Sequence, residues 1–300
     1  SIDVETTDGT LSVGTSTLLD GTTVINGVTA NGSGNITLSG TSSTAGGLVV
    51  AQAVTANTGK ITLKGHANGT DATAPGVNET GLLINSSTVT TNGDVEIEGT
   101  TKADFRNGGT VFAGVRNRFG TVSGRDIKLT AMASDTSADV LGYLGSGGNL
   151  VASGKLEAVA ESKGAGVCFY IFGGKAQSGT GMNIQGTSRT VDGIGLAGGT
   201  RILNELTTVT ATGTVVLTGK TDNTLTANAV GLYNSVITNT SADGGIQIKA
   251  DKGNIKANNG STNPNTITNA GVGAVVLSAG PTLGTDGGAI DGTVLTITQN

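Results

Sequence analysis

Three acidic residues, Asp94, Glu96 and Glu98, alternate along one short segment of the sequence. In an extended strand, residues two positions apart point to the same side, so these carboxylates are expected to share one face. Such a face could perform acid–base chemistry or bind calcium. The alternative, which we favour, is a solvated strand face with a neighbouring lysine. The same interpretation applies to a second acidic group at Asp135, Asp139, Glu157 and Glu161.

The chain contains one histidine, His66, and one cysteine, Cys168. No His, Cys or Glu lies at ligand spacing near His66, so we expect it to be a corner residue in solvent. A single free thiol in a large chain is more often a small core hydrophobe than a nucleophile. We therefore predict no catalytic residue, no metal site and no cofactor.

Aromatic and arginine residues concentrate in the middle of the chain. All but one of the aromatic residues lie between Phe105 and Phe172. Aromatic residues and arginine are enriched at contact sites, which suggests a binding patch for a glycan or a protein. The alternative that we favour is an aromatic stack inside the fold with solvated arginines around it. The candidate residues of such a patch are Arg106, Arg116, Arg118, Tyr170 and Tyr233.

A repeated phrase in the sequence determines how these residues are positioned. It consists of Val-Thr-Ala, a polar corner and an Ile-x-Leu element followed by glycine, and it occurs at 28–40, 54–65, 89–99 and 209–219. An apolar pair around one polar residue, then a glycine, indicates a short strand with a tight exit. Taking the last apolar residue of each element as a marker gives a series from Val13 through Leu38 and Leu277 to Ile297, with a period of about 30 residues.

Each period contains three short extended pieces separated by corners rich in Gly and Asn, which tolerate positive φ. Three strands and three corners per coil describe a triangular prism. The sequence therefore predicts an all-β fold, a right-handed parallel β-helix with three strands per coil and about ten coils. We expect residues 1–300 to form a single β-helix with an irregular central segment at 105–172. Because the chain opens in the middle of the pattern, we interpret it as a fragment of a longer repeat protein.

The alternating pattern also predicts which residues face inward. Residues such as Ile61, Leu63 and Ile97 are expected in the core, whereas Glu96 and Lys128 are expected to face water. Stacking of equivalent strands then places Lys128 between Glu96 and Glu157, one coil on either side. It also places Lys64 beside Glu98. Each exposed ion pair adds only about 0.2–1 kcal/mol, so these pairs serve as markers of the register.

Composition excludes several classes of protein. The net charge is −5 at pH 7, which argues against nucleic acid as a partner because phosphate binding needs a basic surface. No segment approaches the length of a membrane-spanning helix. With only 1 cysteine, the chain forms no internal disulfide.

The repeat resembles the shaft of filamentous-haemagglutinin-type exoproteins, which are secreted adhesins and contact-dependent-inhibition stalks of Gram-negative bacteria. The resemblance rests on Gly-x-Ile-x-Leu-x-Gly, followed by a short apolar strand and Val-Thr-Ala-x-x-Gly, and it covers nearly the whole chain. It implies a β-helical repeat shaft that leaves the cell by two-partner secretion, through an outer-membrane transporter. It also implies an extracellular location, either secreted or displayed at the cell surface.

The leading hypothesis is a non-enzymatic structural and adhesive module. Such a module forms a rigid extracellular shaft that presents, or contributes to, binding of a surface receptor, a host cell or a glycan. Side-by-side association of one rod with another is a further partner interaction that the sequence leaves open.

Two alternatives use the same scaffold. A polysaccharide lyase or hydrolase requires a cleft with several charged residues, and Arg125, Asp126 and Lys128 lie in one coil. Ice binding requires outward rows of threonine. The outer positions Thr37 and Thr62 are followed by Glu96 and Lys128, which break that row.

Overall fold

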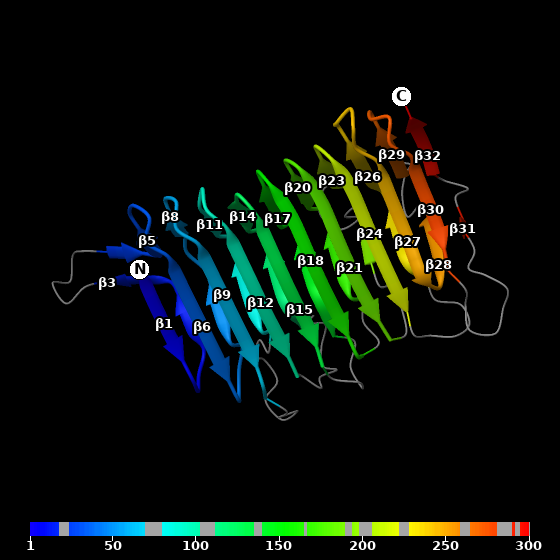
Figure 1. Ribbon diagram of the computed structural model, residues 1–300. Helices are drawn as coiled ribbons and strands as arrows, with labels where there is room; N and C mark the ends of the chain where they lie inside the picture. The colour runs from blue at the N-terminus through cyan, green and yellow to red at the C-terminus, as the bar shows by residue number, and fades with distance from the viewer. Residues whose placement is uncertain are drawn as a thin grey trace.

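The structure is a computed structural model of the 300-residue chain. It describes residues 1–17, 24–69, 80–102, 112–134, 140–164, 167–189, 194–197, 206–221, 228–258, 265–280, 290–291 and 295–299. Every regular element in these ranges is a β-strand. Figure 1 shows the strands stacked side by side into an elongated body, with the N- and C-termini at opposite ends of the stack.

The strands form three parallel sheets of ten strands each. Sheet I contains β1 (Ile2–Thr6), β6 (Ile36–Ser42), β9 (Ile61–Ala67), β12 (Val95–Thr101), β15 (Ile127–Ala133), β18 (Lys155–Ser162), β21 (Gly181–Ser188), β24 (Thr214–Thr221), β27 (Ile246–Lys252) and β30 (Val275–Ala279). Sheet II contains β2 (Leu11–Val13), β7 (Leu48–Val50), β10 (Leu82–Asn85), β13 (Ala113–Arg118), β16 (Leu141–Ser146), β19 (Phe169–Phe172), β22 (Ile194–Ala197), β25 (Asn228–Tyr233), β28 (Asn254–Asn258) and β31 (Ile290–Asp291). Sheet III contains β5 (Val28–Ala30), β8 (Val54–Ala56), β11 (Thr88–Thr90), β14 (Thr121–Gly124), β17 (Asn149–Ala152), β20 (Lys175–Ser178), β23 (Thr207–Ala211), β26 (Ser235–Asn239), β29 (Asn265–Asn269) and β32 (Leu295–Gln299).

The chain visits sheets I, II and III in turn, and each strand pairs with its equivalents in the coils before and after it. This arrangement confirms an all-β parallel β-helix with three strands per coil. The right-handed sense of the coil stays a prediction. One short antiparallel hairpin, β3 (Thr15–Thr17) and β4 (Val24–Asn26), interrupts the first coil between sheets II and III, and the repeat pattern did not predict it.

The core runs along the axis of the stack and is filled by the predicted inward residues. In sheet I, the register aligns Ile61 with Val95 and Ile127, and Leu63 with Ile97 and Leu129, and these side chains are at most 1% exposed. Burial of one such side chain stabilises the fold by about 1.5–3 kcal/mol relative to the exposed state. Long continuous rows of this kind hold the three sheets together.

Two of the sequence markers belong to other sheets. Val13 lies in β2 and pairs with Val50, so the first sheet I strand is Ile2–Thr6, in which Val4 aligns with Leu38. Ile297 lies in β32 of sheet III and pairs with Ile267. Both assignments were wrong because a short apolar–polar–apolar triplet occurs in strands of all three sheets, and only pairing distinguishes them.

The glycine after each Ile-x-Leu element does not end the strand, which corrects the expected tight exit. In β6, β9 and β12 the chain continues for two more residues beyond Gly40, Gly65 and Gly99. These glycines face inward where sheet I approaches sheet II. A Cβ added at Gly99 would lie 2.2 Å from the carbonyl oxygen of Gly114, and one at Gly65 would lie 2.1 Å from that of Gly81. The equivalent position in other coils is also small: Ala131, Ala160, Gly186, Gly219 and Ala250.

The aromatic residues of the central coils divide between the core and the surface. The rings of Tyr143 and Phe169 stack inside the prism with centroids 4.8 Å apart, whereas Tyr170 and Phe172 occupy the alternate, outward positions. Cys168 is fully buried, and burial raises the pKa of its thiol, so it is a core residue as expected. The predicted aromatic stack therefore accounts for part of the aromatic content and leaves two rings on the surface of β19.

The central segment 105–172 is described only in part, because residues 103–111, 135–139 and 165–166 lie outside the described residues. Strands β13, β16 and β19 nevertheless pair successively in sheet II. The three sheets thus pass through this part of the chain. The treatment of residues 1–300 as one unit with an irregular segment stays a prediction.

Replacing Gly99 with valine should destabilise the fold. The new side chain would collide with the backbone of sheet II, and overpacking of this type costs about 1–3 kcal/mol or more. The urea midpoint of unfolding, followed by far-UV circular dichroism, should fall. The matched control is Thr62→Val, a branched side chain on the outward face of β9, which should leave the midpoint nearly unchanged. Equal midpoints for Gly99→Val and the wild type would contradict the proposed role of this glycine.

Candidate functional site

The outer face of sheet I carries the charged residues that the sequence placed there. Lys128 aligns with Glu96 in the preceding coil and with Glu157 in the following coil, which confirms the predicted stack. Lys64 aligns with Glu98, and their charged atoms lie 3.7 Å apart. The register of the charges therefore follows directly from the register of the core.

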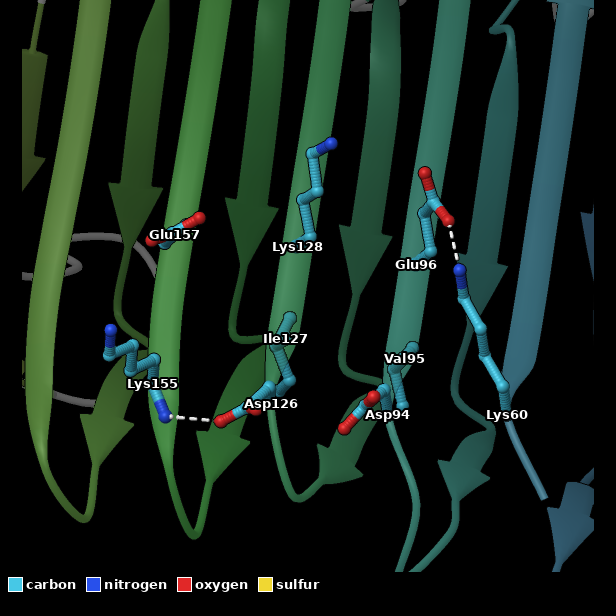
Figure 2. Close-up of a pocket in the computed structure, with 9 residues that line it drawn as sticks. All are labelled: Lys60, Asp94, Val95, Glu96, Asp126, Ile127, Lys128, Lys155 and Glu157. Atoms are coloured by element: carbon cyan, nitrogen blue, oxygen red, sulfur yellow. Dashed lines mark hydrogen bonds and ion pairs between the residues drawn. The ribbon is translucent and has the colours of Figure 1, made fainter.

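These charges surround a pocket at the start of β12, β15 and β18, shown in Figure 2. We call it the charged pocket, and its volume is about 230 Å³. It is lined by Lys60, Asp94, Val95, Glu96, Asp126, Ile127, Lys128, Lys155 and Glu157. Four of these residues, Lys60, Asp94, Asp126 and Lys155, immediately precede or open the sheet I strands of four successive coils. The sequence-based predictions considered Asp94 and Asp126 separately and did not group the charged residues of this corner, although their recurrence at the start of successive strands is visible in the sequence.

Ion pairs and hydrogen bonds hold most of the pocket walls in place. The ammonium of Lys60 donates a hydrogen bond to Glu96. The guanidinium of Arg125, outside the pocket lining, donates two hydrogen bonds of 2.9 Å to the two carboxylate oxygens of Asp94. One oxygen of Asp126 accepts a hydrogen bond of 2.8 Å from the backbone N–H of Lys155. These contacts link neighbouring coils across the outer face.

Three charged groups of the pocket remain exposed and uncommitted. Within the described part of the chain, the ammonium groups of Lys128 and Lys155 and the carboxylate of Glu157 make no hydrogen bond or ion pair. Figure 2 shows all three side chains extending from β15 and β18 over the outer surface. Two cationic groups and one carboxylate are thus available to a bound molecule.

The electrostatics of Glu96 determine its protonation state. The hydrogen bond from Lys60 is the largest influence and lowers the pKa of the Glu96 carboxyl, and the charges of Lys60, Lys128 and Lys64 act in the same direction. Partial burial opposes them by raising the pKa. The net effect keeps Glu96 ionised at neutral pH, which disfavours it as a general acid.

The predicted binding residues on sheet II share one outward face. Arg116 aligns with Leu144, which aligns with Tyr170, and Arg118 follows Arg116 two positions along the same strand. Phe172 aligns with Ala197 and then with Tyr233, so Tyr233 lies two strands further along the stack. Arg106 lies outside the described residues. We call the four remaining predicted residues, Arg116, Arg118, Tyr170 and Tyr233, together with Phe172, which the prediction did not include, the arginine–aromatic face.

Two close contacts occur on this face or at its edge. The rings of Tyr170 and Phe172 lie 6.1 Å apart between centroids, and the guanidinium of Arg118 lies 5.9 Å from the ring centroid of Phe119. Arg116 is half-buried, and burial, followed by the charge of Arg118, lowers the pKa of its guanidinium. Phe119 is 44% exposed, which is unusual for a phenylalanine and adds an apolar group beside the arginines.

Other candidate residues take structural positions. His66 lies within β9, not at a corner, and its Nδ1 is 2.9 Å from the hydroxyl of Thr100 in the next coil. The expected corner position was wrong because the strand continues past Gly65. Among the described residues, no group of three His, Cys, Asp or Glu side chains is arranged to hold a metal ion.

Threonine rows occur on sheet III and not on sheet I. Thr29, Thr55 and Thr90 are in register at one end, and Thr210, Thr238, Thr268 and Thr298 are in register at the other. Ser123, Val151 and Gln177 separate the two runs. The continuous threonine surface that ice binding would need is therefore absent from this row as well.

Comparison with known proteins does not place the chain in a family. No family model, no curated protein and no solved structure matches it. The described residues contain no helix that is long and apolar enough to cross a membrane. The architecture of a β-helical repeat protein is thus supported by the structure itself.

Replacing Lys60 with glutamine should raise the pKa of Glu96 toward its ordinary value, because the largest influence on that carboxyl is removed. The measurement is an NMR titration of the Glu96 side-chain carboxyl in the folded protein. The matched control is Lys64→Gln, which removes the weakest of the contributing charges and should raise the pKa by less. Equal shifts in the two variants would refute the assigned order of causes.

Proposed function

We propose that the protein is a non-enzymatic structural and adhesive module. The observation that carries this proposal is the stacking of ten strands in each of three sheets around one continuous core. Backbone hydrogen bonds between coils run along the length of the stack, and the three sheets brace one another around the core. Bending such a body requires these bonds to stretch together, so it suits a stiff extracellular spacer.

The adhesive part of the proposal is supported by the arginine–aromatic face. Arginine and tyrosine are the side chains that most often dominate binding energy at contact surfaces. Arg116 and Arg118 on β13 and Tyr170 on β19 occupy outward positions of sheet II, with β16 between the two strands. This face would contact a surface receptor or a glycan while the rest of the stack holds it away from the cell.

The resemblance of the repeat to filamentous-haemagglutinin-type exoproteins supports the cellular setting of the proposal. On that basis the chain is exported through an outer-membrane transporter by two-partner secretion. It then acts outside a Gram-negative cell, either released or attached to the surface. Coils can form one after another during export, because each coil contacts mainly its neighbours.

The adhesive proposal is tested by the triple variant Arg116→Gln, Arg118→Gln, Tyr170→Ser. We expect binding of the purified protein to epithelial cells and to immobilised glycans to fall by about tenfold or more, because the main contact groups are lost. The control variant Lys175→Gln, Lys249→Gln, Thr238→Ser makes comparable changes on sheets I and III and should bind like the wild type. Unchanged binding by the triple variant, with an unaltered circular dichroism spectrum, would exclude this face.

A polysaccharide lyase or hydrolase is the second candidate function, and the charged pocket is the observation that favours it. A lyase needs a base near a uronate carboxylate, and a hydrolase needs a carboxylic acid that is still protonated. Lys128 and Asp126 line the pocket, but the pKa of Glu96 is lowered and not raised. The adhesive module is therefore the better supported function.

Incubation with polygalacturonate separates the two functions. We expect neither unsaturated uronate, measured by ultraviolet absorbance, nor new reducing ends. A heat-denatured sample provides the background. Turnover that the wild type shows and the variant Lys128→Gln lacks would overturn the non-enzymatic proposal in favour of the enzyme.

A further inference from the structure

The charged pocket places two cationic side chains beside a carboxylate. Lys128 and Lys155 lie on neighbouring strands, and their positions are offset by two residues because Lys128 aligns with Glu157. Their Cα atoms are therefore about 8 Å apart, from a strand spacing of ~4.8 Å and a rise of ~3.3 Å per residue. Flexible lysine side chains can converge on one anionic group across such a distance. The carboxylate of Glu157 lies beside them as a hydrogen-bond acceptor.

The other acidic groups of the pocket already have partners within the protein. Lys60 neutralises Glu96, and Arg125 neutralises Asp94 through two hydrogen bonds. Asp126 accepts the backbone N–H of Lys155 and lies 3.8 Å from Nε of Arg125. A ligand therefore meets fixed walls, with Lys128, Lys155 and Glu157 left to contact it. Because these side chains are already held in place, less conformational entropy is lost when a ligand binds.

The size and floor of the pocket limit the ligand. A volume of about 230 Å³ is below the ~300–1,000 Å³ of sites for drug-sized molecules, so it suits a single ring. Val95 and Ile127 also line the pocket, but each is only 1% exposed because its side chain faces the core, so the groups presented to a ligand are mainly the charged ones. The pocket lies on the open outer face of a sheet, so a unit within a longer chain could enter while its neighbours continue along the surface.

We propose that the charged pocket binds an acidic sugar unit, a uronic acid within a polysaccharide. Its carboxylate contacts the ammonium groups of Lys128 and Lys155. Its hydroxyl groups donate to the carboxylate of Glu157. This inference rests on the proposed adhesive function and specifies a second contact surface, on sheet I, with its class of ligand.

Calorimetric titration with trigalacturonate tests the inference on the whole chain. We expect the wild type to bind it, with affinity that falls as sodium chloride is added, because partly exposed charge pairs are screened. The fully methyl-esterified trisaccharide keeps the hydroxyl groups, loses the charges and should bind at least about tenfold more weakly. Equal binding of the acid and its ester would overturn the assignment of the lysines.

Variants locate the site. Lys128→Gln together with Lys155→Gln should weaken binding of trigalacturonate by about tenfold or more, whereas the control pair Lys175→Gln and Lys249→Gln should not. Glu157→Gln keeps a hydrogen-bond acceptor and should change the affinity by less than about fivefold. A loss in Glu157→Gln as large as that in the lysine pair would show that the pocket recognises a cation, as in a zwitterionic ligand, and would overturn the proposal.

The two proposals fail separately. If trigalacturonate does not bind but the wild type still adheres to cells through the arginine–aromatic face, the pocket assignment is wrong and the adhesive function stands. If the chain binds neither cells, immobilised glycans nor trigalacturonate, both are wrong. Circular dichroism of each variant checks that the fold is retained.

Discussion

The parallel pairing of each strand with its equivalents in the neighbouring coils is the constraint on which the rest of the structure depends. A shift of one residue between two coils would turn every inward side chain outward. Rows such as Leu63, Ile97 and Leu129 therefore fix the register strongly. Once the core has fixed it, the outward residues have no freedom of position along the stack. The alignment of Lys128 with Glu96 and Glu157 is a consequence of core packing and not its cause.

A second constraint shapes the cross-section of the prism. Where sheet I meets sheet II, the position occupied by Gly99 is glycine or alanine in every aligned coil except the first, where it is Thr6. At Gly99 itself the carbonyl oxygen of Gly114 is too close for a larger side chain. Elsewhere the corners use side-chain hydrogen bonds. Buried Asn239 donates to the side-chain oxygen of buried Asn269 in the next coil at 2.7 Å, which satisfies polar groups that could not reach water.

The surface charges contribute little to stability and much to the chemistry available to a ligand. Exposed ion pairs are each worth about 0–1 kcal/mol, so the fold does not depend on Lys60 and Glu96 or on Arg125 and Asp94. Their effect is to occupy particular charges and leave others uncommitted. A different face, that of sheet II, presents arginines and aromatic rings. The two faces offer different chemistry on one rigid support.

Much of this could be predicted from the sequence because its signals are local and repeated. The alternation around Ile61 and Leu63 was sufficient to assign inside and outside, and the period was sufficient to align the charges of successive coils. The outward position of Tyr170, between buried Phe169 and Ile171, follows from the same alternation. The assignments of Val13 and Ile297 failed because a three-residue pattern does not identify its sheet.

The sequence by itself determined the repeat, the parallel β-helix and the faces on which candidate residues lie, because a period of two along the strand and a recurring coil are properties of the chain alone. Only the tertiary structure decided what those residues do together. Side chains from different coils meet at a corner, where Arg125 binds Asp94 and Lys60 binds Glu96. The pocket beside Lys128 is formed by the same meeting of coils. The role of Gly99 likewise depends on the distance to another sheet, which no pattern along the chain specifies.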